Sequence, residues 1–186
     1  MSSLASGVLL SLIGMLAVGY ASRVAVSQYK YYVLKYGELS SSAIDTKLQI
    51  ADRAHGKYQW NYYLCQFMAS ESWSSYISNR SNSETNMLAA ANDWCARGRE
   101  LNPYDRSLAW VAVNLAGVES PEKAVVVWHD YVDRVFWDPW NLASLIRLKA
   151  RAGQVDQANA LLLLIKGRPE YQGAAAALRT VSRSVE

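Results

Sequence analysis

The chain begins with a long stretch that carries no charge. From Leu4 to Ala21 there is no Asp, Glu, Lys or Arg, and the first charged side chain is Arg23. About 20 apolar residues in a helix span the ~30 Å hydrocarbon core of a bilayer. The stretch reaches this length over residues 4–26, because an Arg near the end of a span extends its guanidinium to the interface. We therefore expect a transmembrane helix here.

A cleaved signal peptide is the alternative interpretation of this segment. Gly19-Tyr20-Ala21 resembles a small-x-small cleavage site. However, signal peptides usually carry a basic region before the apolar run, and no Lys or Arg precedes this one. The pattern therefore favours a retained anchor.

Small residues follow one side of the expected span. They recur at spacings of three and four, with one gap at Val18, and comprise Gly7, Ser11, Gly14, Ala21 and Ala25. Small side chains let helix backbones approach closely in lipid, where packing drives association. The stripe thus indicates packing against another transmembrane helix. The alternative is a weakly hydrophobic anchor that is simply rich in small residues.

Aromatic and basic residues follow the span. The expected membrane-interface group is Arg23, Tyr29, Lys30, Tyr31, Tyr32, Lys35 and Tyr36. Phenol and ammonium groups stay hydrated in the headgroup layer. Since basic residues follow the span and none precedes it, the positive-inside rule places the body in the cytoplasm, with the periplasm as the alternative.

The remainder of the chain has the apolar periodicity of helices. We expect an all-α protein with an anchor and juxtamembrane segment over 1–36, a linker over 37–43 and a helical domain over 44–186. Ser41 or Ser42 is a candidate cap, and Ser120 before Pro121 is a second. Gly117 and Gly153 are expected to end helices. The expected helices cover about 42–55, 60–78, 83–100, 105–116, 120–135, 140–152, 154–166 and 171–184.

The C-terminal half resembles the tetratricopeptide repeat, a helical hairpin of about 34 residues. Leu108-x2-Val111-Ala112-x2-Leu115 is followed by Ala124-x3-Trp128 and Pro139, and Leu142-x2-Leu145-Ile146 is followed by Ala158-x3-Leu162 and Pro169. The match covers about residues 83–170, and the intervals between the prolines depart from the family period. The resemblance implies a degenerate array of antiparallel hairpins with a capping helix. An unrelated helical bundle is the alternative.

The order of segments has a second, looser resemblance. A membrane helix, an exit segment with Arg and Tyr, and degenerate repeats are similar to the C-terminal tail of some bacterial O-antigen ligase or polymerase proteins. The arrangement also resembles anchored repeat proteins that assemble bacterial envelope complexes. These resemblances imply a single-pass protein of a bacterial inner membrane.

No reaction chemistry is recognisable in the sequence. His55 and His129 lie in no nucleophile motif, and no phosphate-binding glycine loop occurs. We therefore expect no catalytic residue, no cofactor and no metal site. We also expect no binding of nucleic acid, since the net charge is only +3 and the basic residues are dispersed. Cys65 and Cys95 are expected to be buried free thiols. A disulfide is the alternative if the body lies outside the cytoplasm.

The candidate partner surface follows from the repeat-like layout. First helices of successive hairpins line a concave face that commonly binds a peptide or helix. The expected partner groove comprises Arg106, Trp110, Val113, Asn114, Trp140, Ser144, Arg147 and Arg151. Trp and Arg are frequent binding hot spots, and this composition suits an acidic, partly apolar segment. Alternatively, Trp110 and Trp140 only fill gaps between hairpins.

The sequence therefore predicts a non-catalytic, membrane-anchored scaffold, assembly factor or accessory subunit that binds other membrane proteins or itself. One alternative is a structural subunit that polymerises through its hydrophobic N-terminal helix. Another is an accessory tail that acts in trans with a cell-envelope glycan enzyme.

Overall fold

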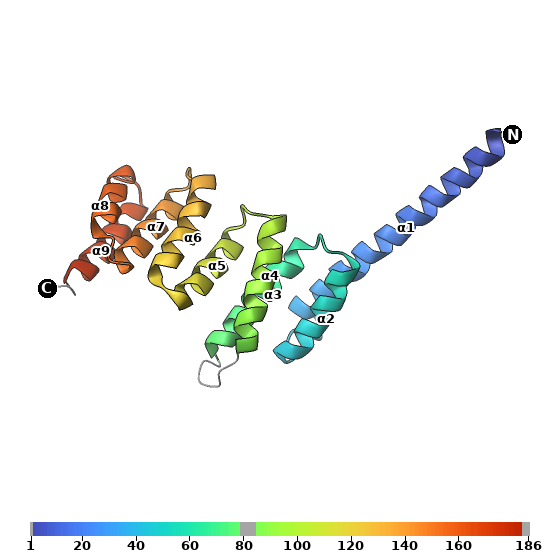
Figure 1. The fold of residues 1–186 in the computed structure, drawn as a ribbon, viewed down its shortest axis with the longest axis horizontal. Coiled ribbons are helices and arrows are strands. Elements are labelled where there is room, and N and C mark those ends of the chain that lie inside the picture. Colours follow the sequence, from blue (N-terminus) through green and yellow to red (C-terminus); the bar gives the residue numbers. More distant parts are fainter. Residues whose placement is uncertain (1, 79–84, 184–186) are drawn as a thin grey trace.

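The protein is an extended array of antiparallel helices from which one long helix projects (Figure 1). The computed structural model describes residues 2–78 and 85–183. Every regular element in this part of the chain is a helix, which confirms the all-α prediction. The helices are α1 (Ser2–Lys35), α2 (Ile44–Lys57), α3 (Tyr62–Ser78), α4 (Thr85–Leu101), α5 (Arg106–Glu119), α6 (Pro121–Arg134), α7 (Pro139–Arg151), α8 (Val155–Leu164) and α9 (Glu170–Arg183).

The predicted helices agree with these boundaries to within a few residues. The start expected at residue 83 and the end expected at residue 184 lie outside the described residues. Ser120 caps α6 as predicted, because its side chain accepts a hydrogen bond from the backbone N–H of Lys123 and Pro121 occupies the first helical position. Gly153 ends α7 with φ of 74°.

Two predictions about helix ends are wrong. Gly117 lies inside α5, which continues to Glu119, and a Cβ at Gly117 would be 3.7 Å from that of Ala124 on α6. The N-cap of α2 is Ala43, with no side-chain hydrogen bond, so neither Ser41 nor Ser42 caps it. The serines instead belong to short turns, in which the N–H of Ser42 bonds to the carbonyl of Leu39.

Three successive hydrophobic cores hold the array together. The first joins the five helices α1, α2, α3, α4 and α5 around Leu64, Met68 and Trp94. The second joins α5, α6 and α7 around Trp128, and the third joins α7, α8 and α9 around Ile146. Neighbouring cores share α5 or α7, so each group of helices packs mainly on the next one along the chain.

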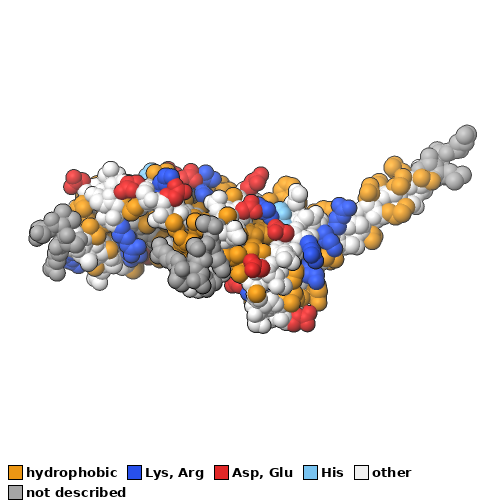
Figure 2. All heavy atoms as spheres, turned by 60° about the horizontal axis from the view of Figure 1, so that its bottom comes forward, with side chains coloured by type: hydrophobic (Ala, Val, Ile, Leu, Met, Phe, Trp, Pro, Cys, Tyr) orange, Lys and Arg blue, Asp and Glu red, His pale blue; other side chains and the backbone are white. Residues whose placement is uncertain are grey.

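Helix α1 has two parts with different environments. Its N-terminal part projects from the body, and its hydrophobic side chains are exposed (Figures 1 and 2). Its C-terminal part packs on α2 and α3 and buries Ser27, Val33 and Leu34. The helical body therefore includes the last turns of α1.

Candidate functional site

The helices α3, α5 and α7 line two adjoining hollows, and α6 also borders the second. The first, of about 550 Å³, is bordered by Ser70, Trp73, Ser74, Arg106, Ser107, Trp110, Val111, Asn114 and Trp140. The second, of about 360 Å³, is bordered by Trp73, Tyr76, Ile77, Val113, Asn114, Gly117, Val118, Pro121, Ala124, Leu148 and Arg151. Because Trp73 and Asn114 border both, the two form one continuous surface, which we call the aromatic groove.

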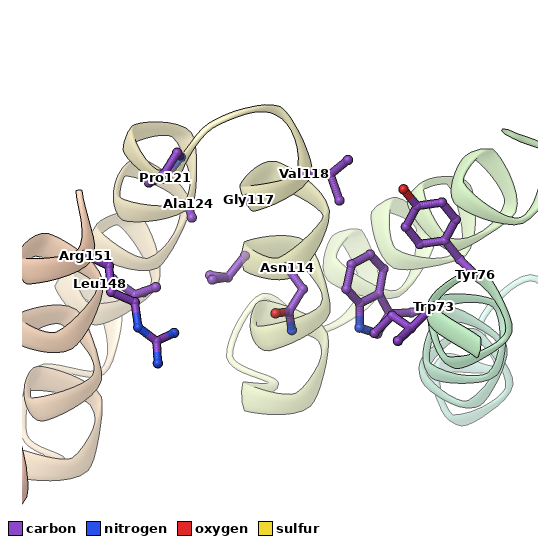
Figure 3. A pocket seen from close by; sticks show the side chains of 11 residues that line it. Trp73, Tyr76, Asn114, Gly117, Val118, Pro121, Ala124, Leu148 and Arg151 are labelled. Carbon is purple, nitrogen blue, oxygen red and sulfur yellow. The ribbon is translucent and has the colours of Figure 1, made fainter. Parts of the chain in front are cut away.

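The second hollow separates α3 from α7. In Figure 3, Trp73 of α3 and Arg151 of α7 lie on opposite sides of it, and Asn114 of α5 lies between them. The amide nitrogen of Asn114 donates to the carbonyl of Trp110, 2.9 Å away, one turn earlier in α5. This bond holds the Asn114 side chain against its own helix.

Trp110 and Trp140 border the first hollow, and both pack against a third tryptophan, Trp128. Trp128 of α6 is fully buried, and its Nε1 donates to the carbonyl of Asn141 at 2.9 Å. Its ring centroid is 5.3 Å from that of Trp110 and 6.0 Å from that of Trp140, both nearly perpendicular to it. Trp110 is 39% exposed and Trp140 is 36% exposed. These two rings thus fill the gap between hairpins and also present a face to solvent.

The groove carries positive charge at two places. The guanidinium of Arg106 lies 4.8 Å from the ring centroid of Trp140 and 3.5 Å from the carboxylate of Asp138. Arg151 is exposed, and no ion pair with a described residue is found for it. An acidic ligand group therefore has one partly compensated cation and one uncompensated cation within the groove.

A cluster of hydrogen bonds holds the N-terminus of α5 against α3. The hydroxyl of Tyr62 donates to Asp105 at 2.8 Å, and Gln66 donates to the same carboxylate. Asp105 also caps α5 by accepting from the N–H of Leu108 at 2.7 Å. Burial and the bond to Asp105 raise the pKa of Tyr62 to about 12, so its hydroxyl stays protonated as a donor.

The structure brings most of the predicted groove residues together. Arg106, Trp110, Asn114 and Trp140 border the first hollow, and Val113, Asn114 and Arg151 border the second.

Two predicted groove residues border neither hollow. Ser144 is buried within the body, and Arg147 lies against α9, where a Cβ on Gly173 would be 2.9 Å from Nη2 of Arg147. The predicted groove is therefore corrected at both positions, because Ser144 is buried and Arg147 lies against α9.

The sequence interpretation missed the contribution of α3. Trp73, Tyr76 and Ile77 border the groove, yet none of them is among the predicted groove residues, and the sequence around them is rich in Ser. Their spacing of three and four residues places them on one helix face, and this was the available signal.

The small residues of α1 are open to their surroundings. Gly7, Ser11, Gly14, Ala21 and Ala25 are all exposed, and a Cβ on Gly7 or Gly14 would have no atom within 4 Å. The hydroxyl of Ser11 bonds back to the carbonyl of Gly7 at 3.0 Å. Among the described residues, the stripe has no packing partner in the chain.

The expected membrane-interface residues have mixed environments. Arg23, Tyr29, Tyr32 and Tyr36 are exposed. Tyr31 is half-buried, with its ring centroid 6.2 Å from those of Tyr63 and Phe67 on α3. The Nζ of Lys35 donates to the Tyr31 hydroxyl at 3.0 Å, and Lys30 is half-exposed. Tyr31 therefore packs against the helical body through α3.

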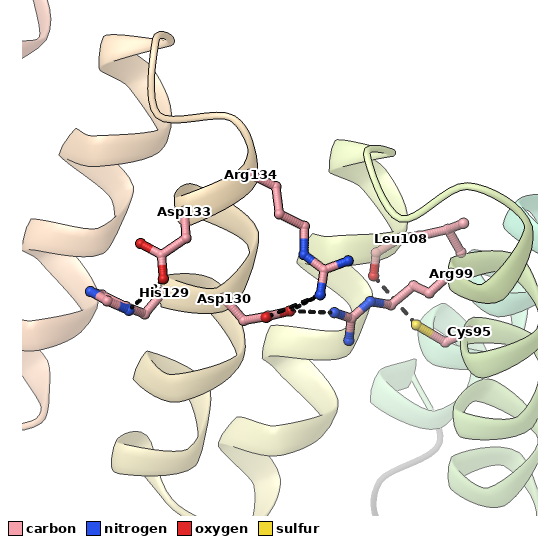
Figure 4. A network of polar contacts seen from close by, with 7 residues as sticks. All are labelled: Cys95, Arg99, Leu108, His129, Asp130, Asp133 and Arg134. Atoms are coloured by element: carbon pink, nitrogen blue, oxygen red, sulfur yellow. Dashed lines mark hydrogen bonds and ion pairs between the residues drawn. The ribbon is translucent and has the colours of Figure 1, made fainter.

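Several exposed ion pairs lie on α4 and α6. Asp130 of α6 accepts from Arg134 and from Arg99 of α4, and His129 lies 3.4 Å from Asp133 (Figure 4). Exposed pairs of this kind contribute little to stability. His55 packs edge-on against Trp94, and burial, together with the nearby Arg97, lowers its pKa.

The two cysteines are buried and free. Burial raises the pKa of each thiol to about 11, so both are poor nucleophiles at neutral pH. Cys95 donates weakly to the carbonyl of Leu108 at 3.3 Å. In the described part of the chain, no three His, Cys, Asp or Glu side chains are placed to hold a metal ion.

Comparisons with known proteins return nothing similar: no protein family, no curated protein and no solved structure matches the chain. The resemblances to repeat proteins and to ligase tails stay predictions. By length and composition, one helix segment in the described residues, Ser6–Lys35, is long and apolar enough to cross a membrane, and an N-terminal signal sequence would have the same features.

Proposed function

We propose that this protein is a non-catalytic, membrane-anchored scaffold or accessory subunit of a membrane complex. Helix α1 inserts into the bilayer over residues 4–26, and the helical body binds a partner in the aromatic groove. The observation that carries the proposal is the exposure of the projecting part of α1, because a soluble protein rarely leaves so large an apolar surface uncovered.

The groove favours an extended segment that is acidic and partly apolar. Trp73, Trp110 and Trp140 offer aromatic faces, and Arg106 and Arg151 offer guanidinium groups within the same surface. Aromatic and Arg side chains contribute a large share of binding energy in protein interfaces. Anchoring both partners in one membrane raises their effective concentration, so the groove itself needs only modest affinity.

The groove is tested by comparing Arg151→Glu with Arg179→Glu in full-length protein purified from membranes in mild detergent. Both arginines are exposed, and Arg179 lies on α9 away from the groove. We expect Arg151→Glu to reduce the co-purifying partner at least fivefold, whereas Arg179→Glu leaves it unchanged. Equal recovery with both variants would contradict a partner in the groove.

The same purification separates the alternative functions. Heterologous membrane proteins at a fixed ratio support the scaffold. A co-purifying multi-pass glycan enzyme indicates an accessory tail that acts in trans. Self-assembly alone indicates a structural subunit, which the open stripe of small residues on α1 also favours.

The stripe is tested by the double change Gly7→Leu and Gly14→Leu. Added bulk there should weaken association in the membrane without releasing the protein from it. The matched control is Leu9→Phe with Leu16→Phe, which adds bulk on the opposite side of α1. Unchanged association in the glycine variant would contradict packing through the stripe.

The side of the membrane is tested with an introduced thiol. Thr46 is exposed on α2, and the natural cysteines are buried. If the body is cytoplasmic, as the basic residues after the span predict, Thr46→Cys stays unlabelled by a membrane-impermeant maleimide in intact cells. Prompt labelling would place the body on the outer side.

A further inference from the structure

Four turns of the body lie along one edge of the array. They are residues 58–61 between α2 and α3, 102–105 between α4 and α5, 135–138 between α6 and α7, and 165–169 between α8 and α9. Figure 1 shows them along the upper edge, the side toward which α1 projects. We call these four segments the turn edge.

The turn edge exposes large aromatic side chains in three successive turns. Trp60 is 70% exposed, Tyr104 is 61% exposed, and Phe136 and Trp137 are 71% and 66% exposed. The fourth turn exposes Lys166 and Arg168 instead. Leu163 and Leu164 are exposed at the adjoining end of α8.

The opposite edge has a different composition. Its described turns contain Ser40, Ser41 and Ser42, then Ser120, then Gly153 and Gln154. Tyr36 is the one exposed aromatic side chain in these described turns. The aromatic residues are therefore concentrated on the edge from which α1 leaves the body.

Two contacts position the first turn of the turn edge, residues 58–61, against the middle of α1. The rings of Tyr20 and Tyr58 meet edge-on with centroids 5.9 Å apart. Asn61 donates to Ser27 at 2.9 Å. Arg23, the first charge after the apolar stretch, lies between these two contacts along α1. The turn that carries Trp60 is therefore held where the expected membrane span ends.

We propose that the turn edge lies in the headgroup layer of the same bilayer that α1 spans. Trp60, Phe136 and Trp137 insert their rings among the lipid headgroups, and the array lies along the membrane surface. This inference rests on the proposed insertion of α1. The occupant is lipid because a row of separate aromatic residues, spread over successive turns at the end of a membrane span, suits a plane.

The charges of the turn edge are compatible with this placement. Asp105 and Asp138 each accept a backbone N–H as helix caps, at 2.7 and 2.9 Å, which compensates part of their charge. Lys166 and Arg168 on the turn edge, and Lys57 beside it at the end of α2, are exposed for lipid phosphates. Membrane helices tilt by about 20° on average and up to about 40°, which allows the edge to meet the surface.

The test measures the depth of nitroxide labels on full-length protein in phosphatidylcholine vesicles. Single cysteines replace Met15 in the span, Phe136 and Lys166 on the turn edge, and Thr46 on α2. The natural thiols are buried and escape labelling. Depth follows from the relative collision rates of each label with oxygen and with a water-soluble nickel complex.

We expect label 15 in the hydrocarbon, labels 136 and 166 at headgroup depth, and label 46 in water. A deep label 15 with labels 136 and 166 as hydrated as label 46 would overturn the placement of the turn edge while leaving the anchor intact. A hydrated label 15 would overturn the proposed anchor itself.

A triple substitution tests the cause of the placement. Trp60→Ser, Phe136→Ser and Trp137→Ser change exposed side chains, so the fold should persist. We expect label 166 to move into water in this variant. The control changes Tyr36 and Val126 to Ser, which are exposed away from the turn edge. An unmoved label 166 in the aromatic variant would contradict insertion through these rings.

Discussion

Asn61 at the start of α3 donates a hydrogen bond from its Nδ2 to the Oγ of Ser27 in α1, and both side chains are buried. The carbonyl oxygen of the same Asn61 side chain accepts from the backbone N–H of Leu64. One residue therefore caps α3 and ties it to α1. The bond lies where the projecting part of α1 enters the body.

This joint gives the first prediction. Asn61→Ala removes a cap and leaves the Ser27 hydroxyl buried without its partner, so the body should lose about 2 kcal/mol of stability. Urea unfolding followed by circular dichroism in one detergent measures this loss. Gln28→Ala is the control and should have little effect, because Gln28 follows Ser27 directly in α1 but is exposed. Equal stability of the two variants would show that the bond contributes nothing.

The C-terminal part of α1 illustrates what the sequence does not reveal. The run from Tyr29 to Tyr36 has the composition of a headgroup segment, and composition alone does not distinguish lipid contact from protein contact. Tyr31 and Leu34 pack in the first core, on a face that also includes Ser27. Their spacing of three and four residues is typical of a helix face, yet the partner on α3 is distant in the sequence.

The helices themselves were predictable because their periodicity and ends are local properties. Ser120-Pro121 and Gly153 mark ends by backbone geometry that depends on few neighbours. The predicted helix end at Gly117 is wrong because glycine also occurs inside helices where another helix is close. The placement of Arg147 in the groove is wrong because its environment depends on α9, whose position follows from tertiary packing.

A close approach between helices gives the second prediction. A Cβ on Gly98 would lie 2.7 Å from Cδ1 of Leu108 and 3.2 Å from the Cβ of Cys65. Gly98→Ala should therefore destabilise the body by about 1–3 kcal/mol through overpacking, despite the better helix propensity of alanine.

Gly56 in α2 provides the matched control, because a Cβ there meets no atom within 4 Å. Gly56→Ala should stabilise the protein by about 0.5–1 kcal/mol. Thermal unfolding of both variants distinguishes the two environments. A stabilising Gly98→Ala would mean that α3, α4 and α5 pack less closely at this point.

The tryptophan cluster gives the third prediction. Trp128→Phe deletes the N–H that bonds to the carbonyl of Asn141 and leaves space beside Trp110, so we expect a loss of about 2 kcal/mol. Trp137→Phe changes a ring on the surface and should stay within about 0.5 kcal/mol of the parent. Urea unfolding measures both, and similar losses would contradict the assignment of Trp128 to the core.

The buried thiols give the fourth prediction, a loss of stability at alkaline pH. Burial raises the pKa of Cys65 and of Cys95 to about 11, whereas a thiol in the unfolded chain has a pKa of about 8.5. Above pH ~8.5 the unfolded state binds fewer protons than the folded state, so the free energy of unfolding falls as pH rises. The fall continues to about pH 11 and is on the order of 3 kcal/mol for each thiol.

Urea unfolding at pH 8, 9.5 and 11 measures this slope. The double variant Cys65→Ala and Cys95→Ala is the control, and its slope should be shallower even if its stability at pH 8 is lower. Part of the slope should remain near pH 11, because the pKa of Tyr62 is raised to about 12 and the unfolded phenol ionises near pH 10. If the double variant keeps the full slope, the thiols are accessible to water and the first core is more open than the packing of α3 and α4 indicates.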